Sequence, residues 1–455
     1  MASKTVTPYI PHTEGDIRRM CEAANVGSID ELVKSVLPEK LRLKSGLKLP
    51  KGLSEQELKA HVEGVSSKNK GANAIKSFLG AGAYNHYSPA AVNHILLRSE
   101  FFTSYTPYQP EASQGTLQAI FEYQTLICQL TGMDISNASL YDGASATAEA
   151  ALMARRVTGR NKVVIAGSVH PEYRETTRTY LYGSDETPLE APFDTKTGLL
   201  DIKAAEAALD DAACLIIQSP NFFGTIENVK ELAELAHSKG ALLVVVISEA
   251  LSMAFLTPAG ELGADIVVGD GQSFGNALSY GGPYLGFMGL SGKFTRQMPG
   301  RVVGETVDKT GKRSFCLTFA TREQHIRREK ATSNICTNQG LAALACSVYL
   351  ALLGKTGLME LASLNIDKAE FLKKKLSAIK GVEIAFSSDT FNEFVIRTKK
   401  NPEVILAALK KKNIVGGLAL KRFYPEMKSH ILVTATEMNT AADIEEFARE
   451  LKRVS

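Results

Sequence analysis

Five short apolar segments between residues 162 and 290 constrain the fold of this chain more than any other feature. Each is rich in β-branched or aliphatic residues, and helical or loop sequence separates it from the next, for example the helical segment 229–238. Near-continuous apolar strands that alternate with helices are typical of a parallel or mostly parallel sheet covered on both faces. The chain is therefore predicted to have an α/β fold. The five predicted strands are 162–166, 213–219, 242–247, 265–268 and 285–288.

The loop after the fourth predicted strand carries a second signal. The apolar run Ile266–Val268 is followed by Gly269-Asp270-Gly271-Gln272-Ser273-Phe274. Loops of this kind lie at the carboxyl edge of a sheet, where open α/β sheets usually hold ligands. In many enzymes that use pyridoxal phosphate, such a loop carries a lysine that binds the cofactor aldehyde covalently. Gln272 stands where that lysine is expected, and its amide is not nucleophilic, so the frame of such a site lacks its anchor. The alternative is an ordinary strand-to-loop exit.

Composition and charge limit the number of domains, the kinds of partner and the compartment that can be expected. The length of 455 residues indicates two or three domains, and a net charge of +3 gives no argument for a nucleic acid or an anionic membrane as partner. Six scattered cysteines show no spacing suited to zinc, so we expect no metal site and buried thiols in a reducing compartment. The start, Met1-Ala2-Ser3-Lys4, leads into polar sequence and not into an apolar signal core. A cytoplasmic protein is predicted.

Three parts of the chain are predicted from helix signals and composition. Residues 1–75 are predicted to form a helical arm, with helices beginning near Ile29 and Glu55 after capping-box serines. Residues 76–338 form the large α/β domain. Residues 339–455 form a long helix, from 339 to about 380, and a small α+β domain with helices beginning at Pro402 and after Thr440. The lysines at 410–412 are explained by helix termination at the asparagine that follows them.

Three polar segments are candidates for ligand or subunit contact. The loop 105–115 is stiffened by two prolines and projects Tyr105, Tyr108, Gln109 and Glu111; packed turns are the alternative. Ser145 and Thr147 begin a helix whose free N–H groups and hydroxyls suit an anion, although many helices begin this way simply to be capped. The densely charged, helical segment 321–330 contains Arg322, His325 and Arg328, which could bind a carboxylate or phosphate; a solvated, salt-bridged helix face explains them better.

Several longer strings resemble one known family. They are Tyr9-Ile10-Pro11-His12-Thr13, the loop 105–115, Asn137-Ala138-Ser139, Gly281-Gly282-Pro283, Met298-Pro299-Gly300-Arg301 and the segments 321–328 and 331–337. These strings resemble the P-protein of the glycine cleavage system, and the likeness runs over essentially the whole chain. That family occurs as one long chain with two related halves or as two subunits. The length and motifs here resemble the N-terminal half, which is subunit 1 of the split format.

The resemblance implies a fold, a chemistry and partners. It implies the fold of the fold-type I pyridoxal-phosphate enzymes, with the cofactor lysine on the other subunit. A second departure agrees with this: after the third predicted strand, Glu249 stands where such a fold places an aspartate against the pyridine nitrogen. The implied enzyme is an oxidoreductase that decarboxylates glycine and transfers the aminomethyl group to the lipoyl arm of the H-protein. The implied partners are P-protein subunit 2, in a heterodimer that pairs into a heterotetramer, the H-protein and, functionally, the T- and L-proteins.

The resemblance also bears on the site residues. No catalytic residue is expected in this chain, but Tyr105, Tyr108, Gln109, Glu111 and Arg301 are candidates for completing the partner's pocket. One alternative is a purely structural or regulatory subunit that contributes no active-site contact. Another is an independent pyridoxal enzyme that uses a different lysine. Lys293 is the nearest candidate for that lysine, and we expect it to be an ordinary surface residue.

Overall fold

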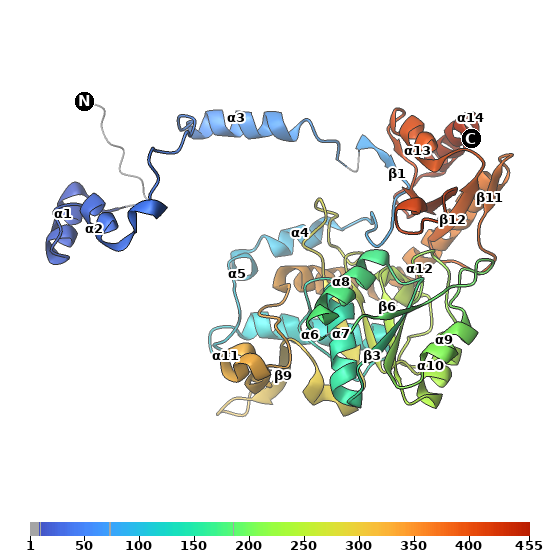
Figure 1. Cartoon of the computed structure of the whole chain (residues 1–455), viewed down its shortest axis with the longest axis horizontal. Helices are drawn as coiled ribbons and strands as arrows, with labels where there is room; N and C mark the ends of the chain where they lie inside the picture. Colours follow the sequence, from blue (N-terminus) through green and yellow to red (C-terminus); the bar gives the residue numbers. More distant parts are fainter. Residues whose placement is uncertain (1–8, 10, 72–73, 185) are drawn as a thin grey trace. The chain divides into compact units, whose positions relative to one another are not determined.

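The computed structural model describes residues 9, 11–71, 74–184 and 186–455, which form two compact units (Figure 1). One unit comprises residues 1–69 and the other residues 70–455. The predicted polar start at Met1–Lys4, and Ile10 in the first family string, lie outside the described residues. The three-part division of the chain at residues 75 and 338 stays a prediction.

The N-terminal unit consists of short helices. Helices begin at Ile29 and Glu55, as predicted, because Ser28 and Ser54 accept hydrogen bonds from the N–H groups three residues on. Apolar side chains of the second and third helices are exposed, among them Val36 and Val62. The elements are α1 (Glu14–Ala23), α2 (Ile29–Val36), the 3₁₀ turn η1 (Glu39–Leu41) and α3 (Glu55–Ser66).

A seven-stranded sheet forms the centre of the second unit. The strand order is β2-β8-β7-β6-β5-β3-β4, and the strands from β7 to β4 pair in parallel. This confirms the predicted α/β fold with a mostly parallel sheet. Strand β8 is antiparallel to β7, because a loop without a crossover helix joins them. The strands are β2 (Ile135–Ser136), β3 (Lys162–Ala166), β4 (Leu189–Ala191), β5 (Ala212–Gln218), β6 (Leu242–Ile247), β7 (Ile266–Asp270) and β8 (Gly286–Leu290).

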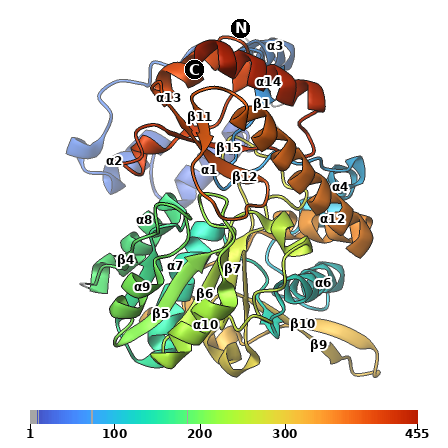
Figure 2. The same ribbon diagram turned by 90° about the vertical axis from the view of Figure 1, so that its right-hand side faces the viewer.

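Helices lie on both sides of this sheet (Figure 2). Helix α7 packs on strands β5 to β8, and α10 packs on β6. Their apolar faces and the fully buried strands form one continuous core, as expected for strands that are apolar on both faces. The helices from α4 to α10 are α4 (Ala90–Leu96), α5 (Ser99–Phe102), α6 (Gln114–Thr131), α7 (Gly143–Thr158), α8 (Pro171–Leu181), α9 (Ile202–Ala208) and α10 (Val229–Ser238), with 3₁₀ turns η3 (Tyr182–Ser184), η4 (Ala250–Ala254) and η5 (Gly292–Gln297).

The predicted long helix is α12 (Gly340–Ser377), and it breaks once, at Gly354. Gly354 has φ 58° and ψ −174°, a conformation that favours glycine. By length and composition α12 is the one helix of the described residues that could span a membrane. It packs against α4, α6 and α14 (Ala441–Val454), and its buried residues belong to the core of the unit.

A small four-stranded antiparallel sheet lies near the C-terminus, in the order β11-β12-β15-β14. Its helices begin at Pro402 and after Thr440, as predicted, and Asn413 ends the first in the left-handed conformation, with φ 57°. Phe78 stacks on Phe447 with 4.3 Å between ring centroids, which joins the start of the unit to its end. The elements are β1 (Lys76–Ser77), β11 (Val382–Ile384), β12 (Glu393–Thr398), α13 (Pro402–Lys410), β13 (Ile414–Val415), β14 (Leu418–Ala419), η8 (Leu420–Arg422) and β15 (His430–Thr434).

The charged segment 321–330 is not one helix, so that prediction is wrong. It follows a hairpin of β9 (Val302–Val307) and β10 (Arg313–Thr318) and forms three short turns: η6 (Ala320–Arg322), α11 (Gln324–Arg327) and η7 (Arg328–Lys330). Arg328 has φ 52° and ends the middle turn, because a side chain in that conformation cannot continue a helix.

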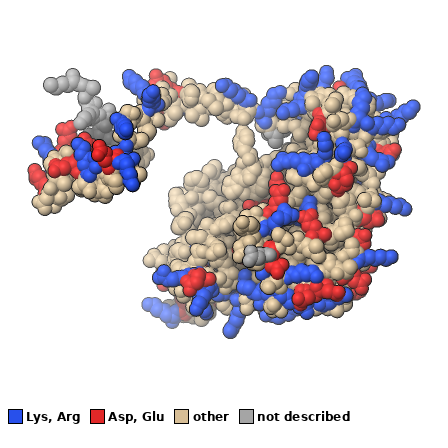
Figure 3. Space-filling model, in the orientation of Figure 1, with Lys and Arg blue, Asp and Glu red and all other residues tan. Residues whose placement is uncertain are grey.

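Charged side chains of both signs and free thiols are spread over the molecule. Figure 3 shows positive and negative side chains mixed over the visible face, in keeping with a net charge of +3. All six cysteines are free, and three of them, Cys21, Cys214 and Cys346, are buried. Cys214, which lies in an apolar run, is buried as expected, whereas Cys336 is exposed.

Candidate functional site

Gln272 lies at the carboxyl edge of the sheet, two residues beyond the end of β7, and it is 2% exposed. Its Oε1 accepts a hydrogen bond from Tyr84 N (2.8 Å), and its Nε2 donates to Tyr84 O (3.0 Å) and to Asn276 O (2.8 Å). The amide therefore pairs with both backbone groups of Tyr84, as a neighbouring strand would. A lysine, which has no acceptor, could not make this pairing.

Glu249 follows β6 and lies beside this loop. Its carboxylate accepts hydrogen bonds from Ser273 Oγ (2.7 Å), Asn392 Nδ2 (3.0 Å) and Leu251 N (3.0 Å). It also faces His86, whose Nε2 lies 3.1 Å from Glu249 Oε2. The glutamate is thus fully engaged by groups of this chain.

His86 lies between two carboxylates. While Nε2 faces Glu249, Nδ1 lies 2.8 Å from Glu437 Oε2, and the His86 side chain is only 3% exposed. Glu437 comes from the loop after β15 and also accepts from Tyr87 N (2.6 Å) and Asn365 Nδ2 (3.0 Å). A ring with a carboxylate on each nitrogen satisfies both only as the imidazolium, because both nitrogens must then donate.

The pKa values follow from this arrangement. Burial by itself lowers the pKa of His86, but the charges and hydrogen bonds of Glu249 and Glu437 outweigh burial and raise it to about 10. Burial likewise raises the pKa of each glutamate, but the facing imidazolium holds both below their ordinary value. A positive charge therefore lies between two negative charges inside the unit at neutral pH.

A neighbouring carboxyl group is held differently. Glu393, at the start of β12, accepts from Ala81 N (2.7 Å), Thr434 Oγ1 (2.7 Å) and Tyr84 Oη (2.9 Å). Burial raises its pKa to about 7, and the negative charge of Glu249 acts in the same direction. Through these hydrogen bonds Glu393 joins the segment 81–84 to the small sheet, close to His86, Glu249 and Glu437.

These pKa shifts predict how a His86 variant depends on pH. The folded-state pKa of about 10 lies above the ordinary value of 6.5, so the stabilisation by His86 is complete below about pH 6.5 and is lost as the pH rises through 10. We expect His86→Gln to lower the free energy of unfolding by about 3 kcal/mol near neutrality, and the difference from the parent chain to shrink as the pH rises from about 6.5 to about 10. Denaturant unfolding across this pH range measures both.

The control for this experiment is His94→Gln, at an exposed position. The groups that face His86 are the carboxylates of Glu249 and Glu437, and the Tyr84 ring lies 6.4 Å away between centroids. A penalty of the same size at all pH values would contradict the buried imidazolium.

The start of α7 was predicted to suit an anion, but groups of the chain already bond the N–H groups of Gly143 and Ser145 and the hydroxyls of Ser145 and Thr147. Asp270 Oδ2 accepts from Gly143 N (3.1 Å), and the N-cap residue Asp142 accepts from Ser145 N (2.7 Å). The hydroxyls of Ser145 and Thr147 turn back to carbonyls of the same segment. A Cβ at Gly143 would lie 2.4 Å from the Tyr173 hydroxyl, so no space remains beside the first residue. The hydroxyls are not free, and the alternative that the helix start is simply capped is the one that the structure shows.

The residues at this edge do not fit pyridoxal phosphate. The cofactor needs an amine for its aldehyde, a carboxylate free to pair with its ring nitrogen, and N–H donors for its phosphate. This chain offers an amide at Gln272, a glutamate already neutralised by His86, and a helix start already bonded to Asp270. The site is a closed polar network.

The candidates for contact with a partner lie elsewhere, around the loop 105–113. Arg301 is 5% exposed, and its Nη2 donates to Tyr108 Oη (2.9 Å) and to Cys336 O (2.6 Å). Its guanidinium also lies over the Tyr108 ring, 5.3 Å from the centroid, and Nε lies 3.8 Å from Glu323 Oε2. The structure thus brings together Tyr108 and Arg301 of the five predicted residues.

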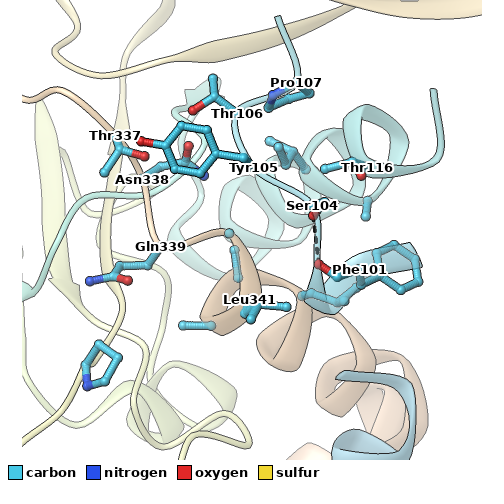
Figure 4. Close-up of a pocket in the computed structure, with 17 residues that line it drawn as sticks. Phe101, Ser104, Tyr105, Thr106, Pro107, Thr116, Thr337, Asn338, Gln339 and Leu341 are labelled. Atoms are coloured by element: carbon cyan, nitrogen blue, oxygen red, sulfur yellow. Dashed lines mark hydrogen bonds between the residues drawn. The ribbon is translucent and has the colours of Figure 1, made fainter. Parts of the chain in front are cut away.

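The other three candidates are exposed. Tyr105 is 82% exposed, and Gln109 and Glu111 also face solvent. Among the described residues their side chains make no hydrogen bond. Tyr105 lines a cavity of about 350 Å³ whose apolar wall includes Ile120 and Leu344. In Figure 4 the Tyr105 ring points toward Thr337 and Asn338, which precede α12.

The remaining charged candidates do not converge on a site. Arg322 donates to the carbonyls of Met298 and Gly300, so it holds a loop. His325 lies 3.7 Å from Glu323, and Arg328 is exposed. Lys293 is a surface residue, as predicted: its side chain is 60% exposed and pairs with Asp265 at 3.1 Å.

Sequence reasoning missed the central pair of this network. In the sequence His86 is one polar residue after the glycine-rich stretch 80–82, and no local pattern marks Glu437. The two residues are 351 positions apart, and no local pattern indicates such a pairing.

Comparison with solved structures defines the class first. The chain shares its fold with a sphingosine-1-phosphate lyase from Burkholderia pseudomallei (TM-score 0.66, 16% identity, 92% of this chain and 94% of that one). It also matches a cysteine desulfurase from Thermococcus onnurineus (TM-score 0.60, 16% identity, 84% and 94%). The unit therefore has the fold of the fold-type I pyridoxal-phosphate enzymes, as the resemblance implied.

The family follows from closer matches. The model of the glycine cleavage system P-protein family matches residues 7–451, and the chain belongs to this family. A crystal structure of glycine decarboxylase (P-protein) of the glycine cleavage system, in inhibitor-bound form, superimposes with a TM-score of 0.89 at 41% identity, over 99% of this chain and 100% of that one. A probable glycine dehydrogenase (decarboxylating) subunit 1 from Desulforamulus reducens is 51% identical over 98% of this chain and 100% of its own length. A protein of the same description from Desulfitobacterium hafniense is 50% identical, over 96% and 97%.

Proposed function

We propose that this chain is subunit 1 of a two-subunit decarboxylating glycine dehydrogenase, the P-protein of a glycine cleavage system. Full-length similarity to proteins described as subunit 1 supports the assignment. The single observation that assigns the cofactor to the other subunit is Gln272. Its buried amide replaces the cofactor lysine and bonds the backbone of Tyr84 and Asn276. The cofactor lysine then belongs to a second subunit.

The reaction belongs to the assembled enzyme. Pyridoxal phosphate on the partner subunit would supply the electron sink for the loss of carbon dioxide from glycine. The aminomethyl group then passes to the oxidised lipoyl arm of the H-protein. The proposed assembly is a heterodimer paired into a heterotetramer, in the cytoplasm, working with the T- and L-proteins.

The contribution of this chain is to shape the partner's pocket. Arg301 bonds both Tyr108 and Cys336, which precedes α12. These bonds fix the loop that carries Tyr105, Gln109 and Glu111. Exposed polar aromatic groups on a stiff loop suit recognition because ordering them on binding costs less entropy. We propose that the exposed residues Tyr105, Tyr108, Gln109 and Glu111 face the glycine or lipoyl site of the partner, and that Arg301 holds them in place from behind.

The test mixes purified subunits. This chain alone, with pyridoxal phosphate, is expected to show neither the visible absorbance of a lysine-bound cofactor nor exchange of labelled bicarbonate into glycine with lipoylated H-protein. The mixture with the second subunit is expected to show both. The second subunit alone controls for activity that needs no partner.

A lysine-bound cofactor on this chain alone would contradict the assignment. If this chain alone binds the cofactor covalently and exchanges label, the role of Gln272 is misassigned and the lysine lies elsewhere in this chain. Borohydride reduction followed by peptide mapping would then identify it.

A further inference from the structure

In this chain the places where an enzyme of the same fold contacts pyridoxal phosphate are filled by side chains of the chain itself. Such enzymes pair a carboxylate with the cationic ring nitrogen, cover the phosphate with the start of a helix and use a lysine as anchor. The corresponding places here are Glu249 after β6, the start of α7 and Gln272 after β7. Each has a protein partner.

His86 takes the place of the cationic ring nitrogen. Its Nε2 points at Glu249 Oε2 from 3.1 Å, and its second nitrogen meets Glu437 at 2.8 Å. The ring supplies one planar cation at a buried position, with a side-chain exposure of 3%. A pyridinium facing a carboxylate makes the same kind of contact, an N–H donated by a cationic aromatic ring.

Asp270 takes the place of the anion. Its carboxylate accepts from Gly143 N (3.1 Å), Gln272 N (3.0 Å) and Leu285 N (3.3 Å). Three converging N–H donors, one of them at the start of α7, are what a phosphate oxygen would require. Asp270 is 2% exposed, so the carboxylate fills this position.

The replaced contacts form one connected network. Asp270 bonds the backbone of Gln272, Ser273 bonds Glu249, and Glu249 faces His86. From His86 the network continues through Glu437 to Asn365 in α12. It therefore links the carboxyl edge of the large sheet to the loop after β15 and to the long helix.

We propose that His86, Asp270 and Gln272 are a built-in replacement for the cofactor, which holds residues 70–455 in the arrangement that bound pyridoxal phosphate supports in enzymes of this fold. The chain then folds and assembles without the cofactor and has no vestigial pocket for it. The inference goes beyond the proposed function, because it concerns the stability of this chain and not the reaction.

The first test is chemical rescue in the full chain. His86→Ala removes the cation and leaves a ring-sized cavity between two carboxylates, so the midpoint of thermal unfolding is expected to fall by about 5 °C. Imidazole, added near pH 6 where it is largely protonated, is expected to recover a measurable part of this shift. Pyrazole, a ring of the same size that stays neutral, is expected to recover none.

Two controls accompany the rescue. His94→Ala, at an exposed position, is expected to change neither the midpoint nor the response to imidazole. If His86→Ala does not fold, Glu437→Gln keeps a hydrogen-bond acceptor beside His86 and tests the same charge pair through a smaller fall in the midpoint. If the unfolding midpoint falls in neither variant, or if imidazole and pyrazole rescue His86→Ala equally, the proposal that His86 replaces a cationic ring is overturned.

The second test asks whether the space is filled. Pyridoxal phosphate added to the parent chain is expected to leave its thermal midpoint unchanged, and Gln272→Lys, checked for folding by circular dichroism, is expected to form no borohydride-stable adduct at residue 272. A rise of the midpoint with the cofactor, or an adduct at residue 272, would show an open pocket and overturn the proposal. Neither readout depends on the activity of the complex.

Discussion

Replacing Arg301 by alanine is expected to lower bicarbonate exchange by the two-subunit complex about 100-fold, because a small displacement of groups that position a substrate can cost that much. Arg301 is buried and is the point where Tyr108, Glu323 and the carbonyl of Cys336 meet. Without the guanidinium, the loop 105–113 and the segment before α12 lose their common support. Exchange of labelled bicarbonate into glycine measures the effect.

The design separates positioning from assembly. Arg301→Lys is expected to restore little, since an ammonium cannot reach several acceptors with the planar geometry of arginine. Arg296→Ala removes an exposed arginine nearby and is expected to leave exchange unchanged. Size-exclusion chromatography of each complex checks that the subunits remain together. Full activity of an intact Arg301→Ala complex would favour the alternative of a purely structural subunit.

Gly224→Ala is expected to destabilise the chain by about 4 kcal/mol or more. Gly224 has φ 82°, and a Cβ there would lie 1.8 Å from the carbonyl oxygen of Glu393. The obstacle is backbone, at the start of β12, so the new methyl group can be accommodated only if the loop after β5 moves away from the small sheet. That movement would break the hydrogen bond from Phe391 N to Gly224 O (3.3 Å).

This loss of stability is measured by denaturant unfolding of the full chain, with circular dichroism as the signal. Gly115→Ala serves as the matched control: a Cβ there meets nothing within 4 Å, the residue is helical, and alanine is the better helix former. We expect the control to be as stable as the parent chain or slightly more stable. Equal stability of Gly224→Ala and the parent would mean that the loop and β12 are not in contact.

Local patterns in the sequence determined many helices and strands in both units. Strands β3 and β6 and helix α10 have the predicted bounds, because continuous apolar runs and amphipathic spacing are local properties. Capping serines and Pro402 marked helix starts for the same reason. The prediction of one helix over 321–330 was wrong, because a helical charge pattern does not reveal the positive φ at Arg328.

What the sequence by itself determined is the α/β fold, the family likeness and the missing lysine at Gln272. Only the tertiary structure decided which groups contact Gln272 and fill the rest of the site, because those contacts join distant segments: Gln272 to Tyr84 across 188 positions and His86 to Glu437 across 351. Propensity and periodicity describe neighbours along the chain. Whether a buried polar group is satisfied depends on partners that only the folded chain brings within hydrogen-bond distance.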